Sequence, residues 1–513
     1  MTTRRDAVKL FGAGLFGAAA FNASSAQATS RRGSTQRDPW APFDAYLEKA
    51  REDWYVPGLA VAIVRDGMVV YSKGFGVANV ETGVRVTADT LFNVGSTSKA
   101  VTAAGIAMLV DQKKLDWDAP VRTYLPAFQL GHGSDYASTS LRDMMSHRTG
   151  LGRHDLLWYN NNDLSLEALL ARVPHLETFA PLRAKYQYNN LMVMLAGHAL
   201  ETASGMSWEA FTKSRIFQPL GMIRSCLTTM EMEHDGNFAN GHRLRADKSQ
   251  YSIPLRPEDR IGPAGAVNSS ANEYAKWVAL QLGRGSLGDV RLFSVAQSNT
   301  MWEPAISAGG VPASPELTRG FYGLGWRLDT YRGIQRVAHG GNLNGFAARV
   351  TLLPEKNIGI IALTNLGATP LPGHVTLDMV DMLLGLPRAN WSARNLVRRD
   401  ASSNAKGAET GPPRVSNTVP SRQLDAYSGH FYHRGYGDLF VTTTSGGLRA
   451  SYNDMPMKLP HWHYDVFNAA PERGEDSDLA DIKFAFLSDV SGQISAVSAK
   501  MDDSTEPVSF LRA

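Results

Sequence analysis

The sequence predicts an α+β domain built on an antiparallel sheet, followed by a small all-β domain. Strand patterns occur between Leu59 and Ser72 and again between Tyr322 and Thr364, and helical periodicity fills the interval between them. Strands at both ends of a helical middle section favour one sheet completed from both ends, with a helical subdomain packed beside it. Short alternating segments near the C-terminus favour a small antiparallel barrel or sandwich.

Composition excludes several function classes. The 513 residues are 43% hydrophobic and 20% charged, which is ordinary for a globular protein with a large core. The formal net charge of +3 is small, and Lys and Arg form no dense stripe interleaved with aromatic residues, which argues against nucleic acid as a partner. Cys226 is the only cysteine, so an intrachain disulfide and metal sites built on paired thiolates are excluded.

The first thirty residues have the features of an export signal peptide. Arg4-Arg5 precedes an apolar run over Leu10–Phe21, and Ala26-Gln27-Ala28 supplies a small-x-small cleavage signal. The arginine pair resembles a twin-arginine signal, although Ala7 stands where that pattern usually has a large apolar residue. About 12 apolar residues cannot cross a bilayer that needs roughly 20, so we expect no stable membrane span. Residues 1–28 are therefore predicted to direct the chain to the periplasm or the medium.

The elements of the first domain are predicted in chain order. A helix over Phe43–Trp54 precedes a hairpin in which Asp66-Gly67 joins strands Leu59–Val64 and Met68–Ser72. Helical periodicity then recurs over a series of segments: Ala100–Val110, Leu141–Ser146, Leu164–Arg172, Leu191–Thr202, Ser207–Phe217 and Ala271–Leu282. The last predicted elements are four strands and one helix: Tyr322–Leu328, Ile334–Ala338, Phe346–Leu353, Ile358–Thr364 and the helix Val375–Leu384.

These patterns divide the chain into consecutive segments. After the signal peptide, the sheet-and-helix domain is expected over residues 40–393. Residues 394–422 are rich in Ser, Asn, Gly, Pro and charge and are predicted to be a linker. Residues 423–513 are expected to form the small β-barrel domain, from roughly seven short alternating segments.

Ser96-Thr97-Ser98-Lys99 is the first candidate for chemistry. Residues three apart share a helix face, so the Lys99 amine can reach the Ser96 hydroxyl. The following helix is apolar nearly all the way round, which indicates burial, and burial lowers the pKa of a lysine until it can act as a base. A helix cap followed by a structural lysine is the alternative, because Ser403-Asn404-Ala405-Lys406 repeats the spacing in the predicted linker.

Two further polar groups are candidates for the same site. In Tyr188-Asn189-Asn190 a phenol and a carboxamide two residues apart can point into one cleft, although a loop tyrosine that covers the core is the alternative. In His339-Gly340-Gly341-Asn342, at a predicted strand end, adjacent glycines let another backbone approach closely, which suits substrate laid along a strand edge. A β-turn with a surface histidine is the alternative there.

Two other features are assigned structural roles. His461, His463 and Asp465 lie on one face of a strand, as ligands of a metal triad would, but no fourth ligand is evident. Barrel packing is the expected role of these alternating aromatic and histidine side chains. Cys226 has no identifiable base beside it and is expected to be a buried structural thiol.

Taken together, Ser96/Lys99, Tyr188/Asn190 and His339-Gly340-Gly341 resemble the penicillin-recognising serine hydrolases. This superfamily contains class C β-lactamases, D-Ala-D-Ala carboxypeptidases, D-aminopeptidases and related esterases. Four more segments look like its framework segments: Ser146–Leu151, Gln218–Met222, Gly262–Gly265 and Tyr322–Trp326. The resemblance runs from about Phe43 to Leu386 and implies a β-lactamase-like sheet flanked by helices. The region after Leu424 resembles an accessory β domain found behind this catalytic domain.

The resemblance implies an acyl-enzyme mechanism without metal or cofactor. Ser96 would attack an amide or ester carbonyl, Lys99 and Tyr188 would share proton transfer, and water would hydrolyse the acyl-enzyme. The N–H groups of Ser96 and Asn342 would form the oxyanion hole. The residues implied in substrate binding are Asn190, His339, Gly340, Gly341 and Asn342.

One departure from the superfamily pattern affects the expected substrate. Typical β-lactamases and carboxypeptidases have Lys-Thr-Gly where this chain has His-Gly-Gly, which looks more like D-aminopeptidases and some esterases. A fixed charge for a substrate carboxylate is thus replaced by a histidine, and we expect kcat/KM to carry a step near pH 6 to 7 from His339.

These observations predict a peptidase or amidase that acts on small or unusual peptides, including peptides that contain D-amino acids. An esterase for small acyl esters is the first alternative, and a β-lactamase is less favoured because of His339. A non-catalytic binding or sensing protein is also less favoured, because all three motifs are retained. The oligomeric state is left open by the sequence.

Overall fold

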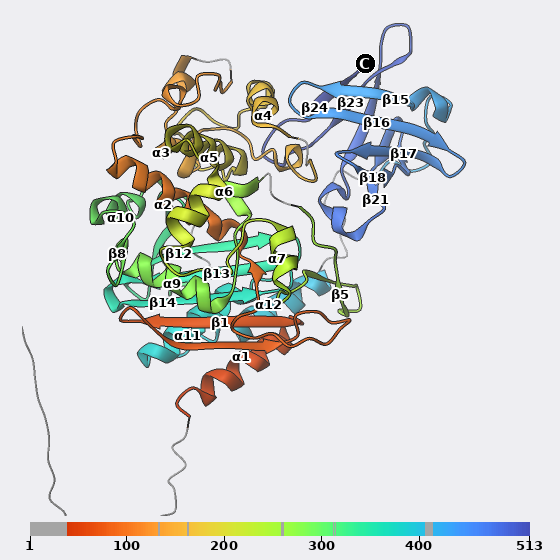
Figure 1. Cartoon of the computed structure of the whole chain (residues 1–513). Helices are drawn as coiled ribbons and strands as arrows, with labels where there is room; N and C mark the ends of the chain where they lie inside the picture. Colours follow the sequence, from red (N-terminus) through yellow and green to blue (C-terminus); the bar gives the residue numbers. More distant parts are fainter. Residues whose placement is uncertain are drawn as a thin grey trace, which may run out of the picture. The chain divides into compact units, whose positions relative to one another are not determined.

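The computed structural model is shown in Figure 1. It describes residues 38–131, 134–161, 164–257, 261–310, 312, 314–405 and 414–513. The predicted signal peptide and Lys406 of the second Ser-x-x-Lys lie outside these ranges. Residues from Pro42 onward form one compact unit, which is described below. Within the described ranges, no helix is both long and apolar enough to cross a membrane.

The first domain is built on an antiparallel sheet that unites both ends of the domain, as predicted. Its eight strands follow the order β2-β1-β14-β13-β12-β11-β10-β9. Their bounds are β1 Gly58–Arg65, β2 Met68–Gly76, β9 Ile306–Ser307, β10 Phe321–Tyr322, β11 Arg327–Tyr331, β12 Ile334–Leu343, β13 Phe346–Leu353 and β14 Ile358–Thr364. The central pairing joins β1 to β14, with Leu59 opposite Thr364 and Arg65 opposite Ile358. Every residue of β14 is buried, which explains its unbroken apolar sequence.

Helices cover both faces of this sheet and form a subdomain beside it. α9 (Ala271–Leu282) packs against β1 and β14, and α11 (Leu371–Leu384) packs against β13 and β14. Side-chain caps start several helices, because a Ser or Asn oxygen accepts from a free backbone N–H of the first turn. In α5 (Asn190–Ser204) the cap is Asn189, which accepts from the N–H of Met192.

The remaining helices of the domain include both short and long segments. Their bounds are α1 Ala41–Asp53, α2 Ser98–Asp111, α3 Leu141–Met145, α4 Leu166–Arg172, α6 Trp208–Phe211, α7 Thr229–Asp235, α8 Gly262–Gly265, α10 Val295–Met301 and α12 Trp391–Ala405. The predicted helix Ser207–Phe217 is divided, because α6 continues as a π-helical segment over Thr212–Phe217. α2 packs against α5 and α8, and its residues from Ser98 to Leu109 are all buried, as the apolar sequence predicted.

Three predicted boundaries near the site are wrong. The strand expected over Tyr322–Leu328 is interrupted between β10 and β11, where Gly325 adopts a φ of +75° and lies against the carbonyl of Lys99. β12 continues beyond Ala338 to Leu343, so the His339 motif lies inside the strand. α12 occupies the first part of the predicted linker.

The position of α12 has a tertiary cause. The indole of Trp391 is buried, and its Nε1–H donates to the Tyr331 hydroxyl at 2.9 Å. Contact with the first domain therefore orders a segment whose composition indicated a linker.

The C-terminal region is a curled all-β half-barrel, drawn in blue in Figure 1. Its ten strands form one antiparallel sheet in the order β19-β20-β22-β23-β24-β15-β16-β17-β18-β21. Their bounds are β15 Gly429–His433, β16 Gly437–Thr444, β17 Gly447–Tyr452, β18 Met455–Lys458, β19 His461–His463, β20 Val466–Asn468, β21 Ala470–Pro471, β22 Lys483–Ser488, β23 Ile494–Ala499 and β24 Val508–Arg512. Aromatic side chains fill its core, with Tyr427, Phe467 and Phe486 in mutual contact.

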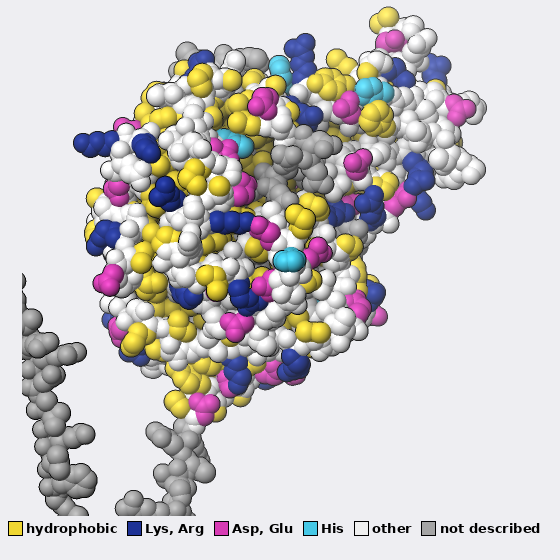
Figure 2. Space-filling model, in the orientation of Figure 1, with side chains coloured by type: hydrophobic (Ala, Val, Ile, Leu, Met, Phe, Trp, Pro, Cys, Tyr) yellow, Lys and Arg dark blue, Asp and Glu magenta, His cyan; other side chains and the backbone are white. Residues whose placement is uncertain are grey.

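The visible face of the molecule carries both signs of charge. In Figure 2, Lys and Arg side chains are interspersed with Asp and Glu side chains over both domains. This distribution agrees with the small net charge of the sequence.

Candidate active site

Ser96 lies in a tight turn that packs directly on strand β12. The turn is a 3₁₀ segment, Gly95–Thr97, which leads into α2. Gly95 has a φ of +53°, and a Cβ added there would lie 2.8 Å from the backbone nitrogen of Asn342. A Cβ on Gly341 would lie 2.0 Å from the carbonyl oxygen of Val94. Of the two glycines after His339, Gly341 is approached closely by a second backbone, which is the chain's own serine turn, whereas a Cβ on Gly340 would meet only ordinary contacts, the nearest at 3.4 Å.

The Lys99 amine is enclosed by three oxygen atoms. Its Nζ lies 3.0 Å from Oγ of Ser96, 2.8 Å from Oδ1 of Asn190 and 2.7 Å from the carbonyl oxygen of Ala264, and the side chain is fully buried. The amide and carbonyl oxygens can only accept hydrogen bonds. A neutral amine therefore donates its two hydrogens to these oxygens and directs its lone pair at the Ser96 hydroxyl.

Electrostatics favour this neutral amine. Burial lowers the pKa of Lys99 well below its ordinary value, and the carboxylate of Asp155 opposes this shift while Arg153 adds to it. Tyr188 completes the group: its ring lies 4.9 Å from the Lys99 nitrogen, and the Ser96 side chain interacts with its hydroxyl and favours the phenolate. Burial raises the pKa of Tyr188, so its phenol stays protonated at neutral pH. The structure thus places a base and a proton donor at the same serine.

Asn190 is held from both ends of its amide group. Its Oδ1 faces Lys99, and its Nδ2 donates to Oδ1 of Asp155 at 2.9 Å. Asp155 also accepts from Nε1 of Trp158 at 2.9 Å and from Nε of Arg153. No sequence motif indicated Asp155 or Arg153 as members of the site.

His339 does not occupy the substrate-facing position that the sequence analysis assigned to it. Its side chain is 3% exposed, and its Nε2 lies 2.7 Å from the hydroxyl of Tyr322, which lies 3.2 Å from Nε2 of His147. Nδ1 of His147 accepts from the backbone N–H of Asn189 at 3.2 Å, so His147 carries its proton on Nε2 and donates to Tyr322. Tyr322 then donates to His339, whose own proton lies on Nδ1.

This network keeps His339 neutral. Burial, followed by the charges of Lys99 and Arg327, lowers the pKa of His339 well below its ordinary value. The expectation of a histidine that titrates near pH 6.5 against substrate is therefore wrong. Because β11 ends its pairing with β12 at Ala338, residues 339–343 of β12 have no partner strand on that side within the described sheet. Of these residues, Asn342 and Leu343 line the cleft in front of Ser96.

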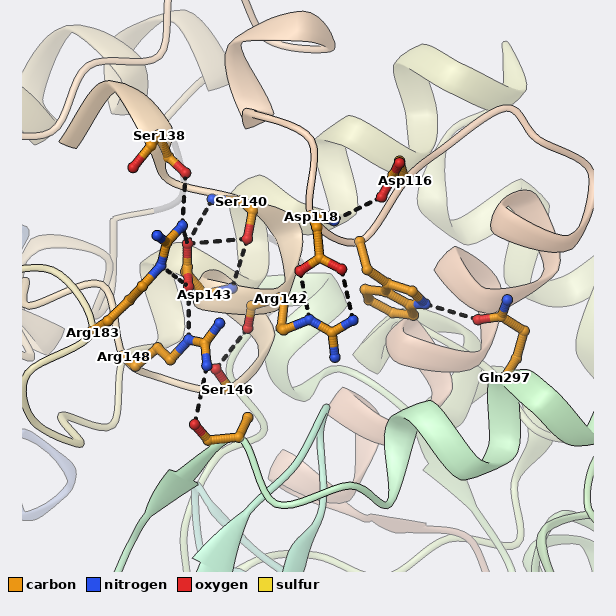
Figure 3. A network of polar contacts seen from close by, with 12 residues as sticks. Asp116, Asp118, Ser138, Ser140, Arg142, Asp143, Ser146, Arg148, Arg183 and Gln297 are labelled. Atoms are coloured by element: carbon orange, nitrogen blue, oxygen red, sulfur yellow. Dashed lines mark hydrogen bonds and ion pairs between the residues drawn. The ribbon is translucent and has the colours of Figure 1, made fainter. Parts of the chain in front are cut away.

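A second polar network fixes the loops around the site (Figure 3). The carboxylate of Asp143, in α3, is buried and accepts from Nε of Arg148 at 2.7 Å and from Nε and Nη2 of Arg183 at 2.9 and 2.8 Å. Burial alone raises the pKa of this carboxyl, but the bonds from Arg183, Ser140 and Arg148 outweigh burial and lower it. The network ties the segment after α3 to the loop that leads to Tyr188.

A cleft of about 1560 Å³ opens in front of Ser96. Of the predicted site residues, Ser96, Asn190 and Asn342 line it, whereas Lys99 lies buried behind Ser96, and His339, Gly340 and Gly341 are not in its walls. Its aromatic lining includes Trp54, Trp158, Tyr159 and Trp462. Part of the wall comes from the C-terminal domain: Trp462, residues 480–483 and residues 500–504.

The side chains of His461, His463 and Asp465 each have identifiable polar partners. His461 lies 2.8 Å from the carbonyl of Tyr464 through Nε2, and His463 accepts from the backbone N–H of Val415. Asp465 instead accepts from Ser421 and Tyr427. Within the described parts of the chain, no group of three or more His, Cys, Asp or Glu is arranged to hold a metal ion. Burial raises the pKa of the Cys226 thiol to about 12.

Family profiles match both domains of the chain. The profile of the Beta-lactamase family matches residues 43–379, and that of a domain of unknown function, DUF3471, matches residues 413–510. Unguisins hydrolase ungD of Aspergillus violaceofuscus is 30% identical over 459 residues, which cover 82% of this chain and 80% of that protein.

Solved structures share the fold. An octameric penicillin-binding protein homologue from Pyrococcus abyssi superposes with a TM-score of 0.61 at 21% identity, over 92% of this chain and 100% of its own. A class C beta lactamase from Rhodobacter sphaeroides superposes with a TM-score of 0.54 at 22% identity, over 66% of this chain and 99% of its own.

Proposed function

Because the chain belongs to the Beta-lactamase family and is a serine hydrolase related to peptide-hydrolysing enzymes, we propose that it hydrolyses amide bonds of peptides through an acyl-enzyme on Ser96. The arrangement of Lys99 carries this proposal. Its Nζ lies 3.0 Å from Oγ of Ser96, and the side chain of Tyr188 interacts with both residues.

The reaction follows from these positions. Lys99 accepts the proton of Ser96 as Oγ attacks the substrate carbonyl. Tyr188 passes its proton to the leaving amine as the C–N bond breaks, and the Lys99 ammonium then returns a proton to Tyr188, which leaves Lys99 neutral again. The N–H groups of Ser96 and Asn342 are the proposed oxyanion hole, in which one donor is worth roughly 3 kcal/mol. Water then attacks the acyl carbonyl and gives a proton to Lys99, and this proton passes to Oγ of Ser96 as the bond between Oγ and the acyl carbon breaks.

The size of the cleft supports peptides as substrates. Sites for small molecules commonly measure roughly 300–1,000 Å³, and this cleft, at about 1560 Å³, has room for several amino-acid residues. The relative ungD is by name a hydrolase of unguisins, which supports hydrolysis as the reaction of this chain. The neutral, buried His339 leaves the strand edge without the fixed charge that would select a free carboxylate, and this supports peptides that lack one at that position.

The test of this proposal is the loss of both labelling and hydrolysis in active-site variants. Ser96→Ala and Lys99→Ala are each expected to lower kcat by several orders of magnitude, because members of a catalytic unit fail together. A fluorophosphonate probe should label wild-type protein at Ser96, located by mass spectrometry, and should not label Ser96→Ala. A loss below tenfold in both variants would contradict the proposal.

A substrate screen separates amides from esters. It compares D- and L-aminoacyl amides, short linear and cyclic peptides, p-nitrophenyl esters and a chromogenic cephalosporin. Turnover of esters alone would favour the esterase alternative. We also propose that residues 1–28 export the protein to the periplasm or the medium.

A further inference from the structure

Asp155 connects the cleft to the amine of Lys99. One carboxylate oxygen accepts from Nδ2 of Asn190 and from Nε1 of Trp158, both at 2.9 Å, and the other accepts from Arg153. Because Asp155 can only accept, it fixes which end of the Asn190 amide faces Lys99. A reversed amide would place its carbonyl oxygen against the carboxylate, where both groups can only accept, and its NH₂ donor against the amine of Lys99. The carboxylate thereby keeps the lone pair of Lys99 directed at Ser96.

The backbone next to Asp155 adopts a conformation that needs outside support. His154 has φ and ψ of 48° and 36°, in the left-handed region, and its side chain is fully buried. Its Nε2 lies 2.7 Å from the carbonyl of Glu177 and must donate to it, so Nδ1 accepts from the hydroxyl of Tyr436 at 2.6 Å. Its backbone N–H donates to Oδ2 of Asp502. Two of these three partners belong to the C-terminal domain.

We propose that Asp155 is the positioning residue for Lys99, acting through Asn190, and that the C-terminal domain holds Asp155 in place through the contacts of Tyr436 and Asp502 with His154. The inference rests on the proposed roles of Ser96 and Lys99. It gives the C-terminal half-barrel a part in catalysis that extends beyond forming a wall of the cleft. Asp502 itself is fixed by Ser504, whose N–H and hydroxyl donate to Oδ1 at 2.7 and 2.5 Å.

The charged and titratable groups around Lys99 determine which of them can produce the acidic limb in the pH dependence of activity. The groups that face it are Asp155 and Arg153 from the loop after α3, His147 and His339, and Tyr188. Burial lowers the pKa of both histidines well below the ordinary value and raises that of Tyr188. Near neutral pH, the acidic limb of activity therefore reports the amine of Lys99 and its interaction with Asp155.

The first experiment measures the rate of fluorophosphonate labelling of Ser96 against pH, which requires no knowledge of the substrate. Asp155→Ala is expected to lower the rate about 10²-fold, as a small misplacement of a catalytic group does. Asp155→Asn keeps an acceptor oxygen but loses the charge, so the rate falls less. Its acidic limb moves to lower pH, because removing an anion disfavours the ammonium form of Lys99. A purely structural role of Asp155 would not move this limb.

The second experiment tests the C-terminal domain. Asp502→Ala and Tyr436→Phe should slow labelling by about tenfold or more, whereas Asp502→Asn, which keeps an acceptor, should recover most of the rate. Arg256→Met is the matched control, because Arg256 pairs at 2.5 Å with buried Asp476 of the C-terminal domain, and this pair does not include His154 or Asp155. Its labelling rate should equal that of the wild type in samples whose circular dichroism shows folded protein.

The outcomes separate the two proposals. If wild-type protein is not labelled at Ser96, the proposed function fails irrespective of Asp155. If Ser96 is labelled but Asp155→Ala and Asp155→Asn keep the wild-type rate and the wild-type acidic limb, the positioning role is overturned. If Arg256→Met slows labelling as much as Asp502→Ala, the effect belongs to domain docking in general, and the specific role of the His154 contacts is overturned.

Discussion

Burial and the neighbouring oxygen atoms both favour the neutral form of the Lys99 amine. Desolvation disfavours the ammonium, and the oxygens of Asn190 and Ala264 accept the two hydrogens that a neutral amine has to offer. Such an arrangement lowers the stability of the folded protein in exchange for a base that functions at neutral pH, a known compromise at active sites.

The stability of a lysine variant checks this interpretation. At pH values below the folded-state pKa of Lys99, each unit by which folding lowers this pKa costs about 1.4 kcal/mol of unfolding free energy. This cost decreases as pH rises above the folded-state pKa and disappears near the unfolded-state pKa of about 10.4. Lys99→Met removes the titrating group. We expect its stability relative to wild type to be greatest near neutral pH and to decline as pH rises toward 10, measured by urea unfolding.

The control for this measurement is Lys49→Met, since the side chain of Lys49 is 75% exposed on α1. Its difference from wild type should not follow the same pH course. A constant difference between Lys99→Met and wild type from pH 7 to 10 would show that Lys99 is charged in the folded protein.

Local spacing explains which site residues were predictable. Ser96 and Lys99 share one helical turn, and Tyr188 and Asn190 stand together before α5, so each pair could be recognised in the sequence. His339 was misjudged because its environment is made by Tyr322 and by burial, which depend on tertiary packing. Asp155 was missed for the same reason: nothing in its neighbours along the chain marks its contact with Asn190.

Among the elements, the serine turn and β12 depend on each other. The Gly95–Thr97 turn approaches Gly341 so closely that neither glycine position has room for a side chain. The nucleophile and the strand edge are therefore held at a fixed separation by backbone packing. The two glycines after His339 predicted a close approach, but only the packing of β12 against the Gly95–Thr97 turn identifies the partner.

Gly341→Ala tests this contact. The new Cβ would lie 2.0 Å from the carbonyl oxygen of Val94, which is a backbone atom, so the turn must shift. Overpacking of this kind costs about 1–3 kcal/mol, and we expect a comparable loss of unfolding free energy together with a fall in kcat of about 10²-fold. Thermal unfolding and substrate turnover are the measurements.

Gly373→Ala is the matched control, because a Cβ there meets nothing within 4 Å and the residue lies in α11. Alanine should be neutral or stabilising by roughly 0.5–1 kcal/mol at a helical position. Equal activity in the Gly341→Ala and wild-type proteins would show that the turn can move without consequence.

At the scale of the whole molecule, the two domains meet at one cleft. The order of strand and helix patterns was enough to predict an antiparallel sheet, a helical subdomain and a separate β domain. It could not show that residues 480–483 and 500–504 reach the cleft, because domain contacts follow from surface shape. The same applies to α12, whose polar sequence resembles a linker and whose order comes from packing of Trp391.

The predicted signal peptide, residues 1–28, determines where the whole protein is expected to be found. In cells that produce the full-length protein, the mature form is expected outside the cytoplasm, with its N-terminus at Thr29 after cleavage behind Ala28. Cell fractionation with N-terminal sequencing measures both properties. A variant that lacks residues 1–28 should stay in the cytoplasm and keep its activity, and export of that variant would contradict the prediction.

The pairing of β1 with β14 also has a consequence for how the chain acquires its structure. Roughly 300 residues separate these neighbouring strands, and at about 5–20 residues per second a ribosome needs on the order of 15–60 seconds to deliver the second after the first. During this interval the apolar strand Gly58–Arg65 has no permanent partner on its β14 side. The nascent chain must therefore be shielded from aggregation for that time, and the sheet that supports Ser96 closes only late in synthesis.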